Sequence, residues 1–348
     1  MKTYFLLFFL ALSSLAVLAQ DNEKTPYLTK SLSNDAISSV VVKTSAGGIS
    51  VSGESGQQPR IEVYIQGNNG NRELSKEEIK RRLDENYDMS IAVDGHELKA
   101  IVKTKHDNMD WDKDGLSISF KIYVPENVST DLSTSGGGIH LSILKGNEKF
   151  TTSGGGLDLN KLNGIIRGNT SGGGIHVSDS GNDIDLHTSG GGITAKNCNG
   201  TIKLETSGGG LDLENLKGTI NAHTSGGGVR GGNIEGELVT STSGGGIDLK
   251  NMDCSLSAST SAGSLRAEMK HVGKYLKLDA NSGNIDLDLP LKQGLSLNIT
   301  ADRINQHPLN ISDFTGDWDK NHIKGTINGG GIPVSADASS GNINVKFN

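Results

Sequence analysis

Residues 206–223 read Thr-Ser-Gly-Gly-Gly-Leu-Asp-Leu-Glu-Asn-Leu-Lys-Gly-Thr-Ile-Asn-Ala-His, and this stretch decides the fold because its pattern recurs along the chain. The pentapeptide Thr-Ser-Gly-Gly-Gly starts at seven positions, each 18 residues after the last: Thr134, Thr152, Thr170, Thr188, Thr206, Thr224 and Thr242. A degenerate eighth copy starts at Thr260. A fixed period without insertions indicates that each repeat is one structural unit stacked on the unit before it.

Within each repeat, apolar and polar residues alternate in two short runs, as at Leu211 and Leu213 and again at Ile220 and Ala222. This is the period of a half-buried β-strand. Glycine-rich corners separate the runs, where the backbone needs unusual dihedral angles or close approach to a neighbouring coil. The sequence therefore predicts an all-β fold, a single-stack parallel β-solenoid of 18-residue coils with two main strands in each coil.

Two columns of equivalent residues should face the interior of this solenoid. The threonines that open the pentapeptides share a strand face with apolar residues such as Ile184 and Leu186, so we expect an internal threonine ladder rather than an ice-binding surface. The residue after each glycine triplet should form an apolar ladder: Ile139, Leu157, Ile175, Ile193, Leu211, Val229, Ile247 and Leu265.

The segments outside the repeats are expected to cap the open ends of the stack. We divide the chain into a signal peptide (1–19), a linker (20–36), an N-terminal cap with a first coil (37–133), the regular repeats (134–285) and C-terminal coils with a cap (286–348). Thr44-Ser45-Ala46-Gly47-Gly48 is an outlying copy of the repeat motif, and the last residues, 343–347, alternate as a closing strand.

One short helix is expected in the β-rich N-terminal cap, between Leu74 and Tyr87. Ser75 and Glu78 have the spacing of a capping box. Ile79, Leu83 and Tyr87 then recur on one helical face, which predicts that this face packs on the cap.

Residues 1–19 have the features of a secretory signal. Lys2 precedes the apolar run 4–12, and Val17 and Ala19 stand at the positions that a signal peptidase reads. No later stretch approaches a membrane span in length. Without Lys2 the chain has 32 basic and 40 acidic residues, a mild acidity that argues against nucleic-acid partners. We therefore expect export to the periplasm, the cell surface or the medium, with no membrane span in the mature chain.

The two cysteines, Cys198 and Cys254, fall three coils apart. At about 4.8 Å per coil their separation is roughly 14 Å, twice the ~7 Å that a disulfide can bridge. Cys198 also occupies a column of apolar residues, so we interpret it as a small core residue.

Histidine and acidic residues alternate in two outward columns. One begins His140, Asp158, His176 and the other reads His187, Glu205, His223. The two histidines of each triple would lie about 9.6 Å apart with no further ligand evident, so solvated charge ladders are expected rather than zinc sites. The spacing of Asp158 and its equivalents also does not fit a calcium-binding nonapeptide. The sequence predicts no cofactor, no metal and no catalytic residues.

The Ser-Gly-Gly-Gly-Ile-x-Leu coils, an N-terminal cap that ends in Ile122-Tyr123-Val124-Pro125, and the signal peptide together resemble the bacterial β-strand-repeat adhesins, relatives of the auto-transporter adhesin head domains. The resemblance covers roughly residues 37–348. It implies an exported, envelope-associated solenoid with an adhesive role and supplies no catalytic residues.

Three classes of function stay open. The first is a non-catalytic adhesin or binding scaffold of the cell envelope, whose partner is an envelope or extracellular protein or glycan. The second is an envelope signalling or stress-associated interaction module. The third is a carbohydrate-active β-helix enzyme, but only Phe150 and Tyr275 are aromatic between Thr134 and Ile285, and Trp111 and Trp318 lie in the caps. We expect a protein that is not an enzyme.

Overall fold

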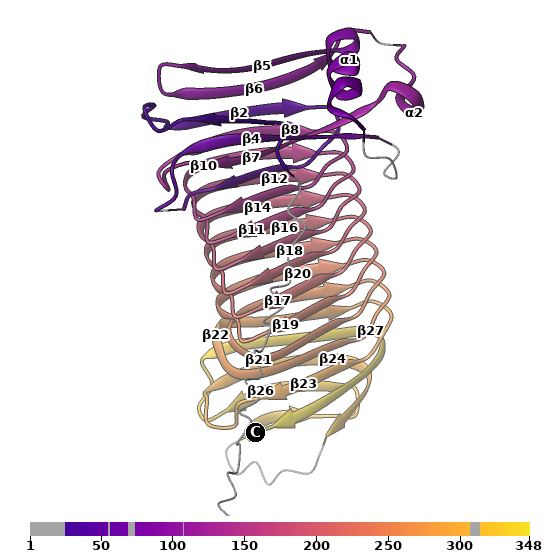
Figure 1. The fold of residues 1–348 in the computed structure, drawn as a ribbon. Helices are drawn as coiled ribbons and strands as arrows, with labels where there is room; N and C mark the ends of the chain where they lie inside the picture. The colour runs from indigo at the N-terminus through magenta and orange to yellow at the C-terminus, as the bar shows by residue number, and fades with distance from the viewer. Residues whose placement is uncertain (1–24, 55, 69–73, 107, 307–313) are drawn as a thin grey trace, which may run out of the picture.

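Each 18-residue repeat forms one coil of an elongated stack (Figure 1). The computed structural model describes residues 25–348, except 55, 69–73, 107 and 307–313. The signal peptide predicted at 1–19 lies outside the described residues, as do the first residues of the predicted linker. Most of the described chain is β-structure, and its only helices are two short ones in the N-terminal cap.

Every coil of the array contributes one short and one long strand. The short strands are β9 (Ile139–Ser142), β11 (Leu157–Asn160), β13 (Ile175–Ser178), β15 (Ile193–Lys196), β17 (Leu211–Glu214) and β19 (Val229–Gly232). The long strands are β8 (Ser129–Thr134), β10 (Lys145–Thr152), β12 (Asn163–Thr170), β14 (Gly181–Thr188), β16 (Asn199–Thr206), β18 (Lys217–Thr224) and β20 (Glu235–Thr242). Each strand pairs in parallel with its equivalent 18 residues away, so Leu157 lies beside both Ile139 and Ile175. The predicted parallel β-solenoid is confirmed.

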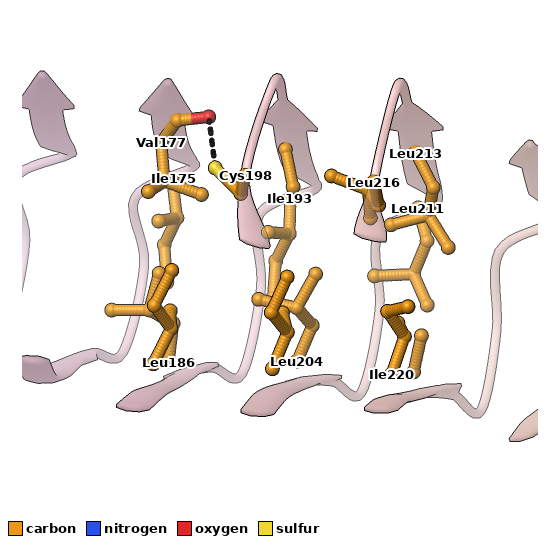
Figure 2. Packing of buried hydrophobic residues seen from close by; sticks show 14 of the residues in the cluster. Ile175, Val177, Leu186, Ile193, Cys198, Leu204, Leu211, Leu213, Leu216 and Ile220 are labelled. Atoms are coloured by element: carbon orange, nitrogen blue, oxygen red, sulfur yellow. Dashed lines mark hydrogen bonds between the residues drawn. The ribbon is translucent and has the colours of Figure 1, made fainter. Parts of the chain in front are cut away.

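The core lies between the short-strand and long-strand ladders. Figure 2 shows the aliphatic side chains of Ile175, Ile193 and Leu211 from the short strands above those of Leu186 and Leu204 from the long strands. All eight members of the predicted apolar ladder are at most 2% exposed, which confirms the ladder. Burying one such side chain stabilises the fold by roughly 1.5–3 kcal/mol, so each coil gains stability from its member of the ladder.

The strict 18-residue register ends near the C-terminal side of the array. Two long strands there, β21 (Ile247–Thr260) and β22 (Leu265–Ala280), run through both sheets of their coils. Leu265 pairs with Ile285 of β23 (Ile285–Leu289), a step of 20 residues. Register shifts between β21 and β22 begin after Leu249, where extra residues are accommodated as bulges.

The N-terminal cap is built around a coil that continues the array. Its strands and helices are β1 (Leu28–Ser31), β2 (Ser39–Thr44), β3 (Ile49–Ser52), β4 (Arg60–Gly67), α1 (Lys76–Asn86), β5 (Tyr87–Asp94), β6 (Glu97–Thr104), α2 (Trp111–Asp114) and β7 (Leu116–Tyr123). Thr44 pairs with Thr134 and Ile49 with Ile139, so the outlying motif copy is in register with the array. Strands β6 and β7 pair with the outer side of this coil, and β5 pairs with β6 beyond them.

The predicted helix is confirmed as α1. The hydroxyl of Ser75 accepts a hydrogen bond of 3.2 Å from the amide of Glu78, while the Glu78 carboxylate accepts from Arg81 and Arg82. Ile79, Leu83 and Tyr87 are buried against the cap. The second helix, α2, is one turn capped by Asp110 and was not predicted. Neither helix of the described chain is long and apolar enough to cross a membrane.

The C-terminal end does not close in chain order. Its strands after β23 are β24 (Leu295–Gln306), β25 (Phe314–Trp318), β26 (His322–Ile327) and β27 (Ile332–Phe347). Ile343 of β27 pairs with Ile285 on one side and Ile304 on the other. The expectation that residues 343–347 form the closing strand is therefore wrong. Strand β27 is inserted between β23 and β24, and the antiparallel strands β26 and β25 cover the outer edge.

Candidate functional site

One regular exposed surface is the outer side of the short strands, here called the short-strand face. Along it runs one outward residue per coil, which we call the outer charge column: His140, Asp158, His176, Thr194, Asp212, Arg230, Asp248, Arg266 and Asp286. Beside it runs the third glycine of each triplet, here called the glycine strip: Gly138, Gly156, Gly174, Gly192, Gly210, Gly228 and Gly246, continued by Ser264 and Asn284.

A groove of about 720 Å³ follows these two columns from Gly174 to Asp286. Its walls are the glycine strip, the edges of the apolar ladder and the outer charge column. Because the strip carries no side chains until Ser264, the charged side chains stand above it on one side only. The groove therefore extends along the stack axis rather than forming a closed pocket.

The glycines of each triplet have different physical roles. A Cβ on the middle glycine, Gly209, would overlap the carbonyl group of Gly191 in the neighbouring coil. A Cβ on the third glycine, Gly210, would come within 3.0 Å of the Gly228 carbonyl oxygen, a tight contact. Ser264 takes the third position in its own coil, so this position does accept a side chain. The middle glycine is thus required by coil packing, whereas the third keeps the groove open.

The glycine strip also presents free hydrogen-bond donors. In the fifth motif, the amide of Gly208 donates to the Ser189 carbonyl and that of Gly209 to the Thr206 hydroxyl. The amide of Gly210 has no acceptor among the described residues, and the same holds for its equivalents in neighbouring coils: Gly174, Gly192, Gly228 and Gly246. One unpaired N–H group per coil therefore lies along the groove.

Three charged groups in the groove are also unpaired among the described residues. Arg230, Arg266 and Asp212 form no ion pair or side-chain hydrogen bond with any residue that the structure describes. Asp248 contacts Lys250 through Oδ2 at 3.3 Å, but its Oδ1 is buried without a partner in the described chain. Cationic and anionic groups are both available to a ligand.

The outer side of the long strands differs, because its charges neutralise one another. Arg167 pairs with Asp183, and Lys203 lies 3.1 Å from Glu205 and 4.0 Å from Asp185. These pairs are exposed, and each is worth about 1 kcal/mol or less. The long-strand face therefore offers fewer free charges.

Of the two histidine–acid triples, the one that begins at His140 is exposed and the one that begins at His187 is half-buried. His140 Nδ1 lies 3.3 Å from Asp158, and His187 Nδ1 lies 3.8 Å from Glu205. His223 instead contacts the Ser241 hydroxyl at 2.7 Å. Over the described ranges, no group of three His, Cys, Asp or Glu residues is arranged to hold a metal ion.

The cysteines and threonines are structural. Cys198 and Cys254 are free and buried, and burial raises the pKa of the Cys254 thiol to about 12. The Cys198 thiol lies in the core 3.8 Å from the Val177 carbonyl oxygen, which confirms its interpretation as a core residue (Figure 2). The threonine ladder is internal as predicted, with the hydroxyl of Thr206 donating to the Gly191 carbonyl at 2.7 Å.

Two features escaped the sequence reasoning. Asparagine side chains form a ladder at a corner with φ near 54°, in which Asn215 donates to Asn197 at 3.0 Å and Asn233 to Asn215 at 3.1 Å. The recurrence of these asparagines every 18 residues in the sequence could have predicted the ladder.

The second feature is Glu148, a carboxyl that is 1% exposed and lies in register with Ile166. Desolvation raises its pKa to about 7.

Two solved structures are similar to this chain. One is a "putative cell adhesion protein" from Clostridium sporogenes ATCC 15579, with 11% identity, a TM-score of 0.20, and coverage of 92% of this chain and 98% of that one. The other is a "putative adhesin" from Bacteroides fragilis NCTC 9343, with 14% identity, a TM-score of 0.28, and coverage of 74% and 95%. No curated protein matches.

A family model described as Toastrack DUF4097 matches residues 37–346. The match begins at the start of the predicted N-terminal cap and ends within the last strand, β27. It therefore includes the cap, the glycine-rich coils and the inserted C-terminal strand, and it confirms the resemblance to a β-repeat family. The chain belongs to the Toastrack DUF4097 family.

Proposed function

We propose that this chain is an exported, non-catalytic binding module of the cell envelope. Its short-strand face would contact another envelope or extracellular macromolecule. The observation that carries the proposal is the groove itself, in which unpaired N–H groups recur at coil spacing beside the unpaired charges of Asp212, Arg230 and Arg266. The proposal of export rests on the secretory signal that the sequence predicts at residues 1–19.

A repeated surface suits a repeated ligand. Successive coils present equivalent groups about 4.8 Å apart, so a long partner can make many weak contacts at once. Affinity then accumulates through multiplicity rather than through one enclosed pocket. Because the core fixes the coil spacing, the face is already ordered before it meets a partner.

The placement of perturbed ionisable groups supports a non-catalytic role. Active sites place groups with shifted pKa values in clefts that a substrate can reach. Here the strongly shifted carboxyl of Glu148 and thiol of Cys254 are buried in the core and do not line the groove. The groove also lacks Phe, Tyr and Trp side chains, which disfavours a carbohydrate-active enzyme.

Capture from an envelope extract tests the proposal. The mature chain is compared with a variant that lacks residues 170–241, a deletion that joins equivalent positions because Thr170 and Thr242 share a column. We expect the deletion to lose most of the captured partner while keeping a cooperative melting transition. Equal capture by both proteins would show that the array is a spacer and would overturn the proposal. A sensor kinase or anti-sigma factor as the captured partner would favour the signalling alternative.

A further inference from the structure

Resting on the function proposed above, we infer that the groove binds an extended glycan in which acidic and neutral sugar units alternate. One sugar unit would lie over each coil. The inference comes from three features of the groove: the order of its charges, the free amides of the glycine strip, and the distance from one coil to the next.

The charges alternate with a period of two coils. Arg230 lies between Asp212 and Asp248, and Arg266 lies between Asp248 and Asp286. The two arginines are therefore about 9.6 Å apart along the stack. A polymer with a two-unit repeat of that length places the same chemical group opposite each arginine.

The chemistry of the two kinds of position differs. A guanidinium recognises a carboxylate through paired charge-assisted hydrogen bonds, so a uronic acid fits opposite Arg230 and Arg266. An ionised carboxylate accepts hydrogen bonds only, so the hydroxyl groups of a neutral sugar fit opposite Asp212 and Asp248. The three aspartates of this column that line the groove, Asp212, Asp248 and Asp286, would repel a polymer with a carboxylate on every unit. A neutral polymer would leave both guanidinium groups without anionic partners.

The glycine strip completes the fit. Its free N–H groups, one per coil at Gly192, Gly210 and Gly228, can donate to oxygen atoms spaced along a sugar backbone. The missing side chains let that backbone approach closely. An extended peptide repeats a side-chain direction about every 6.6 Å, which does not match the coil spacing of about 4.8 Å. A pyranose unit in an extended chain is close to one coil in length.

Titration with three defined polysaccharides tests the inference on the mature chain. The probes are an unsulfated polymer of alternating glucuronate and N-acetylglucosamine, a polygalacturonate with a carboxylate on every unit, and a neutral β-linked glucose oligomer. We expect the alternating polymer to bind most tightly. The double variant R230A/R266A should weaken that binding roughly tenfold or more, because two charge-assisted contacts are lost. The control K203A, on the long-strand face, should leave the affinity unchanged.

A second pair of variants tests the groove without changing charge. G210N/G228N places side chains in the glycine strip, where Asn284 already stands in a later coil, and should block the alternating polymer. G208A/G226A changes the neighbouring first glycines, which do not line the groove and where Ala262 occurs naturally, and should bind as the parent does. Melting curves of all variants check that each remains folded, and the arginine variant decides the question if G210N/G228N unfolds.

Equal binding of all three polymers, no binding of the alternating polymer, or binding that R230A/R266A does not weaken would each overturn the inference. Failure here differs from failure of the proposed function. If the chain captures an envelope partner in a coil-dependent way but binds none of the three glycans, the binding role stands and the ligand class is wrong. If neither capture nor titration depends on the coils, both proposals are wrong.

Discussion

Each coil turns at two corners that obey different physical rules. At the glycine corner, the middle residue of the triplet is glycine in every copy from Gly47 to Gly341. At the corner between the short and long strands, here called the asparagine corner, the residue with positive φ varies: Ile143, Lys161, Asp179, Asn197, Asn215, Asn233 and Asn251. One corner has glycine in every copy of the motif, and the other accepts even the β-branched residue Ile143.

The difference between the two corners shows that backbone overlap restricts the residue type more strictly than positive φ does. At the glycine corner a Cβ would overlap backbone atoms of the neighbouring coil, and those atoms cannot move without separating the coils. At the asparagine corner the φ values of 51–58° are unfavourable for a residue with a side chain, but the cost is only about 1–2 kcal/mol. Asparagine reduces this cost through local hydrogen bonds.

The largest effect should follow from filling the glycine corner. We expect G209A to lower the free energy of unfolding by roughly 3 kcal/mol or more, because the coils must separate to admit the methyl group. The matched control is G208A, whose position is occupied by alanine at Ala46 and Ala262. Denaturant titration measures both variants. Equal destabilisation by G208A and G209A would contradict the steric account.

The stability of the protein should depend on pH because of Glu148. This side chain is a carboxyl in a column whose other members are apolar residues or hydrogen-bonded polar residues. Thr130 donates to its Oε2 at 2.6 Å, but Oε1 is buried without a partner in the described chain. Burial raises the pKa of this carboxyl from 4.5 to about 7, so between these values the unfolded chain ionises while the folded chain keeps its proton.

Stability should therefore fall as the pH rises from about 4.5 to about 7, and the loss above that range should reach about 3 kcal/mol. E148Q removes this contribution while keeping the shape of the side chain. We therefore compare the unfolding free energies of E148Q and the parent by denaturant titration at pH 4.5 and at pH 8. The difference, E148Q minus parent, should be more positive at pH 8 than at pH 4.5. A difference between the two proteins that does not change with pH would show that Glu148 ionises equally in both states.

The threonine at the glycine corner should have an intermediate effect. The hydroxyl of Thr206 donates to the Gly191 carbonyl at 2.7 Å and accepts from the Gly209 amide at 3.3 Å. T206V leaves both buried backbone groups unpaired and should cost about 2 kcal/mol in unfolding free energy. T206S keeps the hydroxyl and loses only a methyl group, worth about 0.8 kcal/mol. A T206V protein as stable as T206S would indicate that the ladder acts by packing alone.

The 18-residue period of the sequence predicted the features that repeat from coil to coil, namely the paired strands and the buried columns of side chains. Because alternate residues of a strand face the same side, the sequence placed Thr188 in the core together with Ile184. Because Cys198 and Cys254 lie three coils apart, the sequence also excluded a disulfide between them. The asparagine ladder was equally readable, since Asn197 and Asn215 recur at the same period. The division of the chain at 133/134 and 285/286 stays a prediction.

Features that depend on non-equivalent segments could not be predicted in this way. Strand β27 lies between β23 and β24, so the spatial order of these strands differs from their order in the chain, and the alternating pattern of each strand does not reveal that order. The groove depends on which amides lack acceptors and on which side chains are missing, and neither appears as a residue motif. Phe150 illustrates the same limit, because its ring fills the space beside Gly168 in the next coil.

The smallest effect should come from the asparagine corner. N215A removes the hydrogen bonds to Asn197 and Asn233 and places alanine at φ 54°, so we expect a loss of about 1 kcal/mol. N215G loses the same bonds but adopts this φ without strain, so it should be more stable than N215A by a few tenths of a kcal/mol or more. N215K should be tolerated because Lys161 occupies the equivalent position. Thermal melts of the three variants rank them. If N215A were as damaging as G209A, positive φ would be as strict a constraint as backbone overlap, and the two corners would not differ in kind.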